Sequence, residues 1–424
     1  MTATAQRCVW YVSKYNVLPA PGNSAGSRGF RILAELAKQG YRAVMVTSDA
    51  NHVVAGVAVD HEEPYPVREI EGVTVVTVRT FKSRRARSWR RVVSWLDFEW
   101  RLSRMPMEDL PRPDAVIVSS LSLLTIFNGF ALRRRVGARL VFEVRDIWPL
   151  TLTEEGGFSR WNPVVMALGV VERWGYRTSD AIVGTMPNLR QHVAEVTGKD
   201  LEVVCIPMGV TEQHLSPGEP LPDSYIAELG QGRFQITYAG TIGATNALQT
   251  LMECARLAHE AQESGLHFVV AGDGDLRESF MREYGHLPNL TFLAKVPKAQ
   301  VPTLLASSDL LYLSVHPSKV WNYGQSLNKL IDYMASGKPI VASYSGFPSM
   351  INEASCGSFA PAGDAEAALR EIRRYREMSV EERTEVGARG RTWLMQHRRY
   401  STLANQYSAV LYGDVEARSE TAPV

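Results

Sequence analysis

Lys329 and Asp332 lie three residues apart in a short predicted helix and therefore share one of its faces. An ammonium group beside the free N–H groups of a helix start suits a diphosphate, and a carboxylate one turn further on accepts hydrogen bonds from a ribose diol. The N–H groups concerned belong to Leu327, Asn328 and Lys329. The pattern predicts a nucleoside diphosphate site, although the same residues also suit an ordinary surface helix with a solvated polar face.

Both ends of this helix are marked in the segment Trp321–Pro339. Ser326 is a suitable N-cap, Gly337 stands where a left-handed residue belongs after a helix, and Pro339 prevents continuation. The side away from Lys329 is apolar and predicted to be buried: Leu330, Ile331 and Met334.

Two glycine-rich turns, one in each half of the chain, each lead into an amphipathic helix. Glycine lets the backbone approach a phosphate closely, so each turn is a candidate part of the same site. The candidate contacts in the turn within 21–29 are Gly26, Ser27 and Arg28. Those in the turn after Phe234–Ala239 are Gly240, Thr241, Gly243 and Asn246. Either turn alone could be only a connection, whereas the pair favours a phosphate site.

Asp273 and Asp275 allow two interpretations, a plain turn after a strand or a carboxylate pair that holds a divalent metal on a diphosphate. We favour the turn, because no third acidic or histidine ligand is visible nearby in the sequence. No metal and no other cofactor is therefore expected.

The predicted strand Leu140–Val144 ends in the charged sequence Glu143-Val144-Arg145-Asp146. Charged groups at the end of a buried strand are often catalytic, so Arg145 and Asp146 are the candidate catalytic residues. A purely structural arginine–carboxylate pair is the alternative. A serine hydrolase is not indicated, because the chain has no G-x-S-x-G sequence.

The segment Phe81–Met105 is a basic amphipathic stretch with eight Lys and Arg residues against two acids. Its apolar side chains share one helical face: Trp89, Val92, Val93, Leu96 and Trp100. Such a helix can lie on an anionic membrane surface. Packing of the same face against its own domain, with the arginines reaching solvent, is the alternative.

The 424 residues, 45% of them hydrophobic, are enough for two domains, and the net charge of +1 argues against a dedicated nucleic-acid binder. The four cysteines form no pair or cluster with metal-ligand spacing, which favours reduced thiols in the cytoplasm.

The first residues lack a secretory signal pattern. The uncharged stretch Ala115–Leu132 is interpreted as a buried strand and a helix, because its serines, asparagine and glycine argue against a membrane span.

Short β-branched runs alternate with helical patterns along the whole chain, which predicts parallel, doubly wound α/β sheets. A Pro- and Gly-rich stretch, 211–232, separates an N-terminal domain, 1–209, from a C-terminal domain, 210–394. The last helical stretch is expected at about 381–411, its end at about 395–411 could pack back onto the first domain, and 413–424 should be a flexible tail. A ligand site is expected in a cleft between the domains, at the carboxyl ends of the strands.

The chain resembles the family-4 retaining glycosyltransferases of the GT-B fold, in particular the bacterial L-fucosamine and cell-surface-polysaccharide transferases. The resemblance rests on Glu143-Val144-Arg145-Asp146-Ile147-Trp148-Pro149 and, most specifically, on the sequence from Asn328 to Ile340. It implies two Rossmann-like domains that face an inter-domain cleft, and transfer of a hexosyl or N-acetylaminosugar group from a nucleotide diphosphate sugar, with UDP expected.

The resemblance also implies residue roles. Asp332 would hold the donor ribose, while Lys329, the helix-start amides and Gly240–Gly243 would hold the diphosphate. Backbone near Lys295 and Val296 would meet the base, Gly26 and its neighbours would close over the phosphates, and Arg145 and Asp146 would face the sugar or acceptor. The acceptor would be a lipid-linked saccharide, which would place the enzyme in the cytoplasm or at the inner face of the cell membrane.

Three family positions differ in this chain. Thr241 and Asn246 stand where many members have Arg and Lys, so the phosphate charge must be met elsewhere, for example by Lys329 or Arg28. The first acid of the family's E-x7-E pair falls on Gly324. Glycosylation of a soluble small molecule, 2-epimerisation of a nucleotide sugar and non-catalytic sensing therefore stay as alternative functions.

Overall fold

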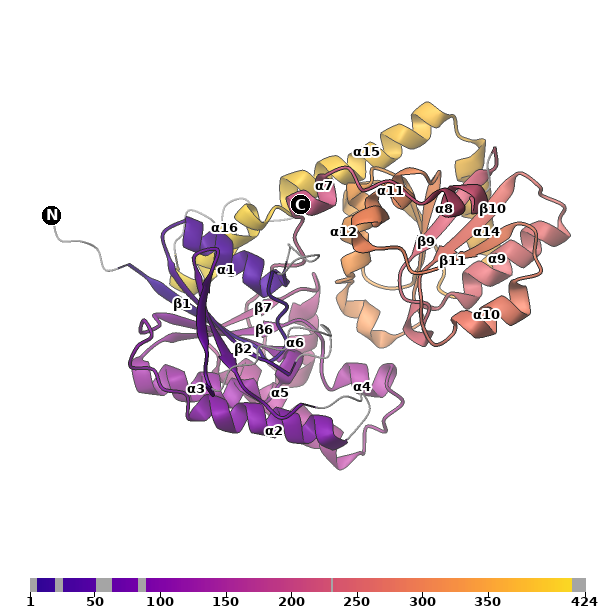
Figure 1. The fold of residues 1–424 in the computed structure, drawn as a ribbon. Coiled ribbons are helices and arrows are strands. Elements are labelled where there is room, and N and C mark those ends of the chain that lie inside the picture. Colours follow the sequence, from indigo (N-terminus) through magenta and orange to yellow (C-terminus); the bar gives the residue numbers. More distant parts are fainter. Residues whose placement is uncertain (1–5, 20–25, 51–62, 83–88, 230–231, 414–424) are drawn as a thin grey trace. The chain divides into compact units, whose positions relative to one another are not determined.

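The computed structural model describes residues 6–19, 26–50, 63–82, 89–229 and 232–413. The contacts divide the chain into two compact units. The first holds the residues up to Gly209 together with the helix that begins at Tyr400, and the second holds Val210–Arg399. Each unit is built on its own sheet (Figure 1).

The described part of the first unit contains an eight-stranded sheet in the order β3-β4-β2-β1-β5-β6-β7-β8. All neighbouring strands are parallel except β3 and β4. The strands are β1 (Cys8–Val12), β2 (Arg42–Ser48), β3 (Val67–Ile70), β4 (Val73–Val78), β5 (Ala115–Ser119), β6 (Arg139–Val144), β7 (Ala181–Gly184) and β8 (Val203–Cys205). The sequence did not predict β3, because this exposed edge strand is polar and has no buried face.

Helices cover both faces of the first sheet. They are α1 (Arg28–Lys38), α2 (Trp89–Ser103), α3 (Thr125–Val136), α4 (Leu150–Glu154), α5 (Pro163–Thr178), α6 (Leu189–Thr197) and α16 (Tyr400–Tyr412). α1 and α16 pack together, and Leu403 and Tyr407 of α16 are buried in the same cluster as Val9, Phe30 and Leu33. α2 and α3 contact each other and the strands. The first unit is therefore completed by a helix from the far end of the chain.

The described part of the second unit contains a six-stranded sheet in the order β11-β10-β9-β12-β13-β14, with every neighbouring pair parallel. The strands are β9 (Phe234–Ala239), β10 (Leu266–Ala271), β11 (Leu290–Leu293), β12 (Leu310–Ser314), β13 (Ile340–Ser343) and β14 (Gly357–Ala360). β14 was not predicted, because its short glycine- and serine-containing sequence carries little strand signal. The two parallel, Rossmann-like sheets confirm the predicted α/β fold class.

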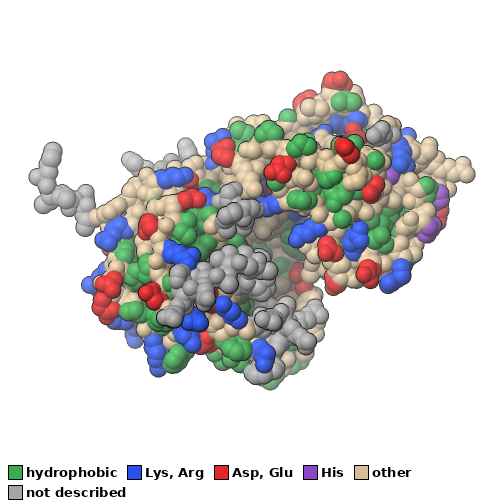
Figure 2. All heavy atoms as spheres, viewed as in Figure 1, with side chains coloured by type: hydrophobic (Ala, Val, Ile, Leu, Met, Phe, Trp, Pro, Cys, Tyr) green, Lys and Arg blue, Asp and Glu red, His purple; other side chains and the backbone are tan. Residues whose placement is uncertain are grey.

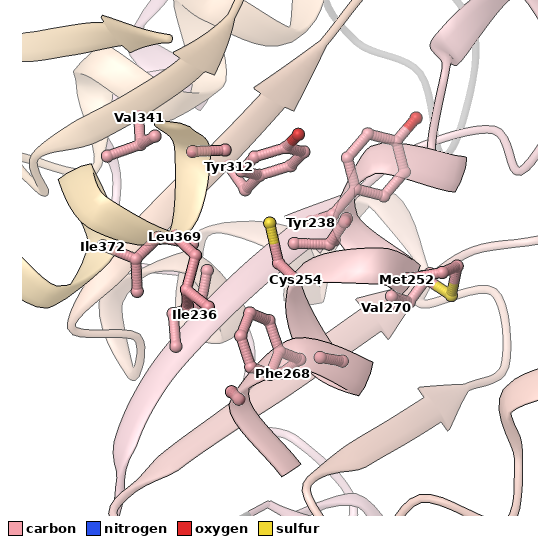
Figure 3. Close-up of a cluster of buried hydrophobic side chains, with 14 of the residues drawn as sticks. Ile236, Tyr238, Met252, Cys254, Phe268, Val270, Tyr312, Val341, Leu369 and Ile372 are labelled. Carbon is pink, nitrogen blue, oxygen red and sulfur yellow. The ribbon is translucent and has the colours of Figure 1, made fainter. Parts of the chain in front are cut away.

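The helices of the second unit are α7 (Glu212–Leu215), α8 (Asp223–Glu228), α9 (Gln249–Glu260), α10 (Arg277–Tyr284), α11 (Val301–Ala306), α12 (Asn328–Ala335), α13 (Met350–Glu353), α14 (Ala365–Glu377) and α15 (Val380–His397). α9 and α14 pack on the sheet over a core that includes Cys254, Phe268 and Ile372 (Figure 3). Tyr238 and Tyr312 are buried in this core as well.

The predicted continuous helix at 381–411 is wrong, because the structure has two helices there, α15 and α16. Arg398 leaves the helical conformation (φ −124°, ψ 13°), and Arg399 forms a parallel bridge with Val210. The returning helix therefore begins at Tyr400 rather than near 395. The predicted tail, 413–424, lies outside the described residues after Gly413.

The uncharged stretch Ala115–Leu132 forms β5 and the first part of α3, as predicted. Among the helices of the described chain, none is both long enough and apolar enough to cross a bilayer.

Candidate functional site

The N-terminus of α12 is formed differently from the sequence prediction. Ser326 does not cap the helix; Leu327 occupies the N-cap position in an extended conformation and contributes no side-chain cap bond. Since leucine has no acceptor atom in its side chain, the first-turn N–H groups of α12 have no side-chain cap. The far end is as predicted, with Gly337 in the left-handed region at φ 70°. Leu330, Ile331 and Met334 are buried.

Lys329 projects from the first turn of α12 onto the residues that end and follow β9. Its Nζ donates hydrogen bonds to Tyr238 Oη, at 2.9 Å, and to Asn246 Oδ1, and it lies 4.7 Å from the centre of the Tyr238 ring. Burial lowers the pKa of Lys329 to about 8. The structure thus brings Lys329 and Asn246 together, and it adds Tyr238, which sequence reasoning had not selected because its spacing marked it only as a strand residue.

The loop after β9 is fixed by backbone bonds to the loop after β10. Gly240 N donates to Ala271 O at 3.0 Å, and Ile242 N donates to Asp273 O at 2.9 Å. A Cβ on Gly272 would lie 1.8 Å from Gly240 O, so this close approach requires glycine. Tyr238 Oη donates to Thr241 O at 2.7 Å, which joins the Gly240–Gly243 loop to the Lys329 cluster.

Asn246 is held in place from the carboxyl end of β12. Ser314 Oγ donates to Asn246 O at 2.7 Å, and a ring nitrogen of His316 lies 2.6 Å from Ala244 O. Tyr333 Oη accepts from Ala239 N at 2.9 Å, which anchors α12 to β9. The candidate phosphate residues of the second unit therefore rest on three rigid elements, β9, β12 and α12.

Asp332 lies beside a histidine that the sequence analysis did not select. His214 Nε2, on α7, is 3.7 Å from Asp332 Oδ1. His214 Nδ1 accepts from Thr211 N at 3.1 Å, which directs Nε2 toward the carboxylate. Burial raises the pKa of Asp332 and lowers that of His214, while the nearby Lys298 counteracts the rise in the pKa of Asp332. No sequence signal links the two residues, because only the packing of α7 on α12 brings them together.

A cavity of about 290 Å³ adjoins this pair within the second unit. His214, Asp332 and Ser336 line it, together with Thr303 of α11 and Arg391 of α15. Lys295 and Val296 follow β11; Lys295 is exposed, whereas Val296 packs on Leu293.

Asp273 and Asp275 are both exposed, and Asp273 accepts a hydrogen bond from Gly274 N at 2.8 Å. Throughout the described segments, no group of three His, Cys, Asp or Glu residues is placed to hold a metal ion.

The prediction that Arg28 contacts the phosphates is wrong. Its side chain is fully buried; Nε donates to Pro207 O at 2.9 Å, and the guanidinium also bonds Ile206 O and the Glu143 carboxylate. The guanidinium is therefore committed to its own unit and does not face a phosphate. Its neighbour Ser27 donates through Oγ to Asn16 Oδ1 at 3.0 Å, and Gly26 has a left-handed φ of 65°.

Glu143 is the centre of a buried network in the first unit. Tyr11 and Tyr407 donate hydrogen bonds to the carboxylate that pairs with Arg28. Burial alone would raise the pKa of Glu143, but Arg28, Arg145 and the tyrosines hold it at about 2. The structural alternative is therefore the correct interpretation for Glu143.

Arg145 and Asp146 follow this network at the carboxyl end of β6. Arg145 N donates to Ser120 Oγ at 3.0 Å, and Thr185 Oγ1 donates to Arg145 O at 3.2 Å, which fixes the backbone from β5 and β7. Arg145 is half-buried and Asp146 is exposed. Asp146 is thus at the sheet edge where the sequence predicted catalytic groups.

Two family models match the chain in these regions. One, described as glycosyl transferases group 1, matches residues 233–377, and the other, described as a glycosyl transferase 4-like domain, matches residues 26–209. The chain is a GT-B glycosyltransferase. No curated protein matches the sequence significantly.

Solved structures share the fold of this glycosyltransferase at low identity. A UDP-forming trehalose-phosphate synthase from Burkholderia vietnamiensis has a TM-score of 0.72 and 14% identity, over 97% of this chain and 100% of that one. Sucrose-phosphate synthase from Thermosynechococcus elongatus has a TM-score of 0.69 and 15% identity, over 96% and 98%. Anabaena HepE, solved with UDP, has a TM-score of 0.64 and 12% identity, over 96% and 100%.

Proposed function

We propose that this glycosyltransferase moves a sugar from a uridine diphosphate sugar to an acceptor hydroxyl, with retention of the anomeric configuration. The observation that carries the proposal is the Lys329 cluster, in which one ammonium group lies against Tyr238 and Asn246 beside the Gly240–Gly243 loop. The uncapped start of α12 adds backbone donors to the same place. Structures with UDP in their titles, such as that of Anabaena HepE, support uridine as the base.

In this reaction the bond between the anomeric carbon and the diphosphate oxygen breaks, and negative charge develops on the leaving diphosphate. Lys329 and the first-turn N–H groups of α12 would stabilise that charge, since preorganised donors act where charge appears. The acceptor oxygen bonds to the anomeric carbon from the face that the diphosphate leaves. The hydroxyl proton passes to a diphosphate oxygen, so no covalent intermediate on the enzyme is needed.

The nucleoside would bind with its ribose diol at Asp332 and its base near the backbone of Lys295 and Val296. Asp332 is half-exposed at the rim of the cavity next to His214, which fits a carboxylate that receives hydrogen bonds from outside the protein. In the first unit, Gly26 and Ser27 would approach the phosphates, and Arg145 and Asp146 would face the transferred sugar or the acceptor.

Gln325 is a candidate contact to the donor sugar. It follows Gly324, the position at which the family's first acid is missing, and it is only 4% exposed. Neither polar atom of its amide has a hydrogen-bond partner within the described chain. A buried amide without partners is costly, so a sugar hydroxyl at this place would be favoured.

The acceptor would be a lipid-linked saccharide of cell-surface polysaccharide synthesis, like the acceptor of an L-fucosamine-type transferase. The segment Phe81–Met105 would bind the cytoplasmic face of the membrane and so bring the enzyme to this acceptor. Part of this segment, 83–88, with Arg84, Arg85 and Arg87, lies outside the described residues. The described part of α2 exposes Val92, Leu96 and Trp100, which favours the membrane over packing within the unit.

A screen of nucleotide sugars for thermal stabilisation, followed by product analysis with lipid-linked and soluble acceptors, tests the function. A matching donor at 100 times its dissociation constant should stabilise the protein by about 2.7 kcal/mol. Formation of a retained glycoside with release of UDP would support the proposal. Release of a free epimer without acceptor would indicate a 2-epimerase, and binding without any turnover would indicate a sensor.

A further inference from the structure

Large apolar side chains are exposed on three helices of the first unit, α2, α3 and α5, and on the loop before α5. Leu96 and Trp100 of α2 are about half exposed, and Phe127 of α3 is similar. Trp161 in the loop and Val170 of α5 are each 70% exposed, and Met166, one turn before Val170 on the same helix face, is exposed as well. An apolar surface that runs over three elements marks an interaction site rather than chance exposure.

These helices form one layer over the sheet. Thr125 Oγ1 and Asn128 Nδ2 of α3 donate to the Glu99 carboxylate of α2, at 2.6 and 2.7 Å. Phe127 of α3 stacks on Trp174 of α5 with 5.0 Å between ring centres. The layer is therefore continuous from α2 through α3 to α5.

The inner side of the layer has its own, different apolar residues. Phe98 and Leu102 of α2, Ile126 of α3, and Val165 and Leu168 of α5 are buried. The exposed residues are thus additional to the core and would remain in water if nothing covered them. α2 and α5 are therefore apolar on two sides, and α3 adds Phe127 to the exposed side, which is unusual for helices on the surface of a globular unit.

The charges on this layer are distributed unevenly. Arginine guanidinium groups lie over exposed aromatic rings, Arg104 at 4.2 Å from the centre of Trp100 and Arg160 at 4.9 Å from that of Trp161. The carboxylates of these helices are all engaged within the unit. Glu99 accepts a hydrogen bond from Thr125 of α3, Glu172 lies 2.7 Å from His192, and Asp97 accepts from Arg101. Along the edge where Figure 1 places α2 and α3, Figure 2 shows blue Lys and Arg side chains beside green apolar ones.

We infer that the outer faces of α2, α3 and α5, with Trp161, form one interfacial surface that lies on an anionic lipid bilayer. Tryptophans and aliphatic side chains would enter the headgroup boundary, and the arginines beside the rings would pair with lipid phosphates. The sequence analysis had located only the α2 part, because α5 and its loop carry no run of basic residues. The surface rests on the proposed lipid-linked acceptor for its purpose, but its binding to lipid is independent of donor chemistry.

Sedimentation with vesicles of phosphatidylcholine, with and without phosphatidylglycerol, tests the inference on the full chain. The parent should pellet with the anionic vesicles at low salt and lose at least tenfold in apparent affinity at high salt. The variant Met166→Ser/Val170→Ser and the variant Leu96→Ser/Trp100→Ser should each bind at least tenfold more weakly. Val380→Ser, which removes a 63%-exposed valine of the second unit, is the matched control and should bind like the parent.

Binding of UDP by the same variants separates this inference from the proposed function. If the α5 variant keeps the parent's affinity for vesicles, the surface does not extend to α5 and the inference is wrong. Failure of the parent to pellet with anionic vesicles at any salt concentration would overturn the inference. Self-association of the parent that the α5 variant abolishes would overturn it in favour of a surface between copies of this chain. Loss of UDP binding in all proteins, with vesicle binding intact, would count only against the proposed function.

Discussion

Lys329 donates a hydrogen bond to Asn246, although 83 positions separate the two residues in the chain. Asn246 stands at a position where the resemblance places a basic residue in many family members. In this chain the ammonium group reaches the same place from α12, and Tyr238 holds it from the other side. Under the proposed function, α12 would therefore supply the positive charge that a diphosphate needs, in place of basic residues after β9.

The first prediction concerns the affinity for UDP. Lys329→Ala should weaken binding by roughly 1.5–3 kcal/mol, because it removes a charge-assisted contact to the diphosphate. Isothermal titration calorimetry measures the effect. Lys319→Ala, which removes an exposed lysine of the same unit, is the control and should bind UDP like the parent. Equal affinities of all three proteins would show that the phosphates bind elsewhere.

The second prediction is a pH dependence of the same affinity. Burial lowers the pKa of Lys329 to about 8, so the free protein loses this proton as the pH rises through 8. A bound diphosphate favours the charged form, and the affinity for UDP should therefore be constant below about pH 7 and fall above about pH 8. Lys329→Arg should remove the decline, because arginine stays protonated. A parent affinity that is flat up to about pH 9.5 would contradict the assignment.

The fold and part of this site follow from local sequence patterns. Most strands of both sheets, such as β2 and β4, are buried and rich in β-branched residues, and Gly337 and Pro339 mark the end of α12, so short-range rules were sufficient there. Arg28 was misassigned because its partner Glu143 and the carbonyl of Pro207 are more than 100 residues away. His214 and Tyr238 were missed for the same reason, since only packing brings them to α12.

The third prediction distinguishes protein contacts to the ribose from contacts to the diphosphate. Asp332→Ala should weaken UDP by about 1–3 kcal/mol through the loss of hydrogen bonds to the ribose diol, and it should leave the affinity for inorganic pyrophosphate unchanged. His214→Ala should act in the same direction but less strongly, because His214 Nε2 faces the carboxylate at 3.7 Å and helps to orient it. An equal loss for UDP and pyrophosphate would place Asp332 at the phosphates instead.

The fourth prediction is that turnover needs no divalent metal. Asp273 is engaged with Gly274 N, and no third ligand accompanies Asp273 and Asp275 in the described chain. Donor consumption measured with and without a chelator should therefore be the same. Abolition by the chelator and recovery with magnesium or manganese would restore the interpretation of these aspartates as a metal-binding pair.

The fifth prediction tests the structural role of Arg28. Arg28→Leu would leave the Glu143 carboxylate buried without its cation, and the free energy of unfolding should fall by about 3–5 kcal/mol at neutral pH. The parent should lose the same stabilisation as the pH falls below about 4.5, because the folded-state pKa of Glu143 is about 2 and the carboxylate is protonated first in the unfolded chain. Denaturant unfolding of the parent and the variant across this pH range measures both effects.

A double variant gives this test its control. Arg28→Leu/Glu143→Gln removes both charges but keeps an amide oxygen that accepts from Tyr11 and Tyr407, and it should recover most of the lost stability, since most of the cost arises from the unpaired charge. UDP affinity, measured on folded protein, should be the same in the parent and the double variant, because the Arg28 guanidinium faces Glu143 and two backbone carbonyls. If the double variant is stable but no longer binds UDP, Arg28 contacts the phosphates after all.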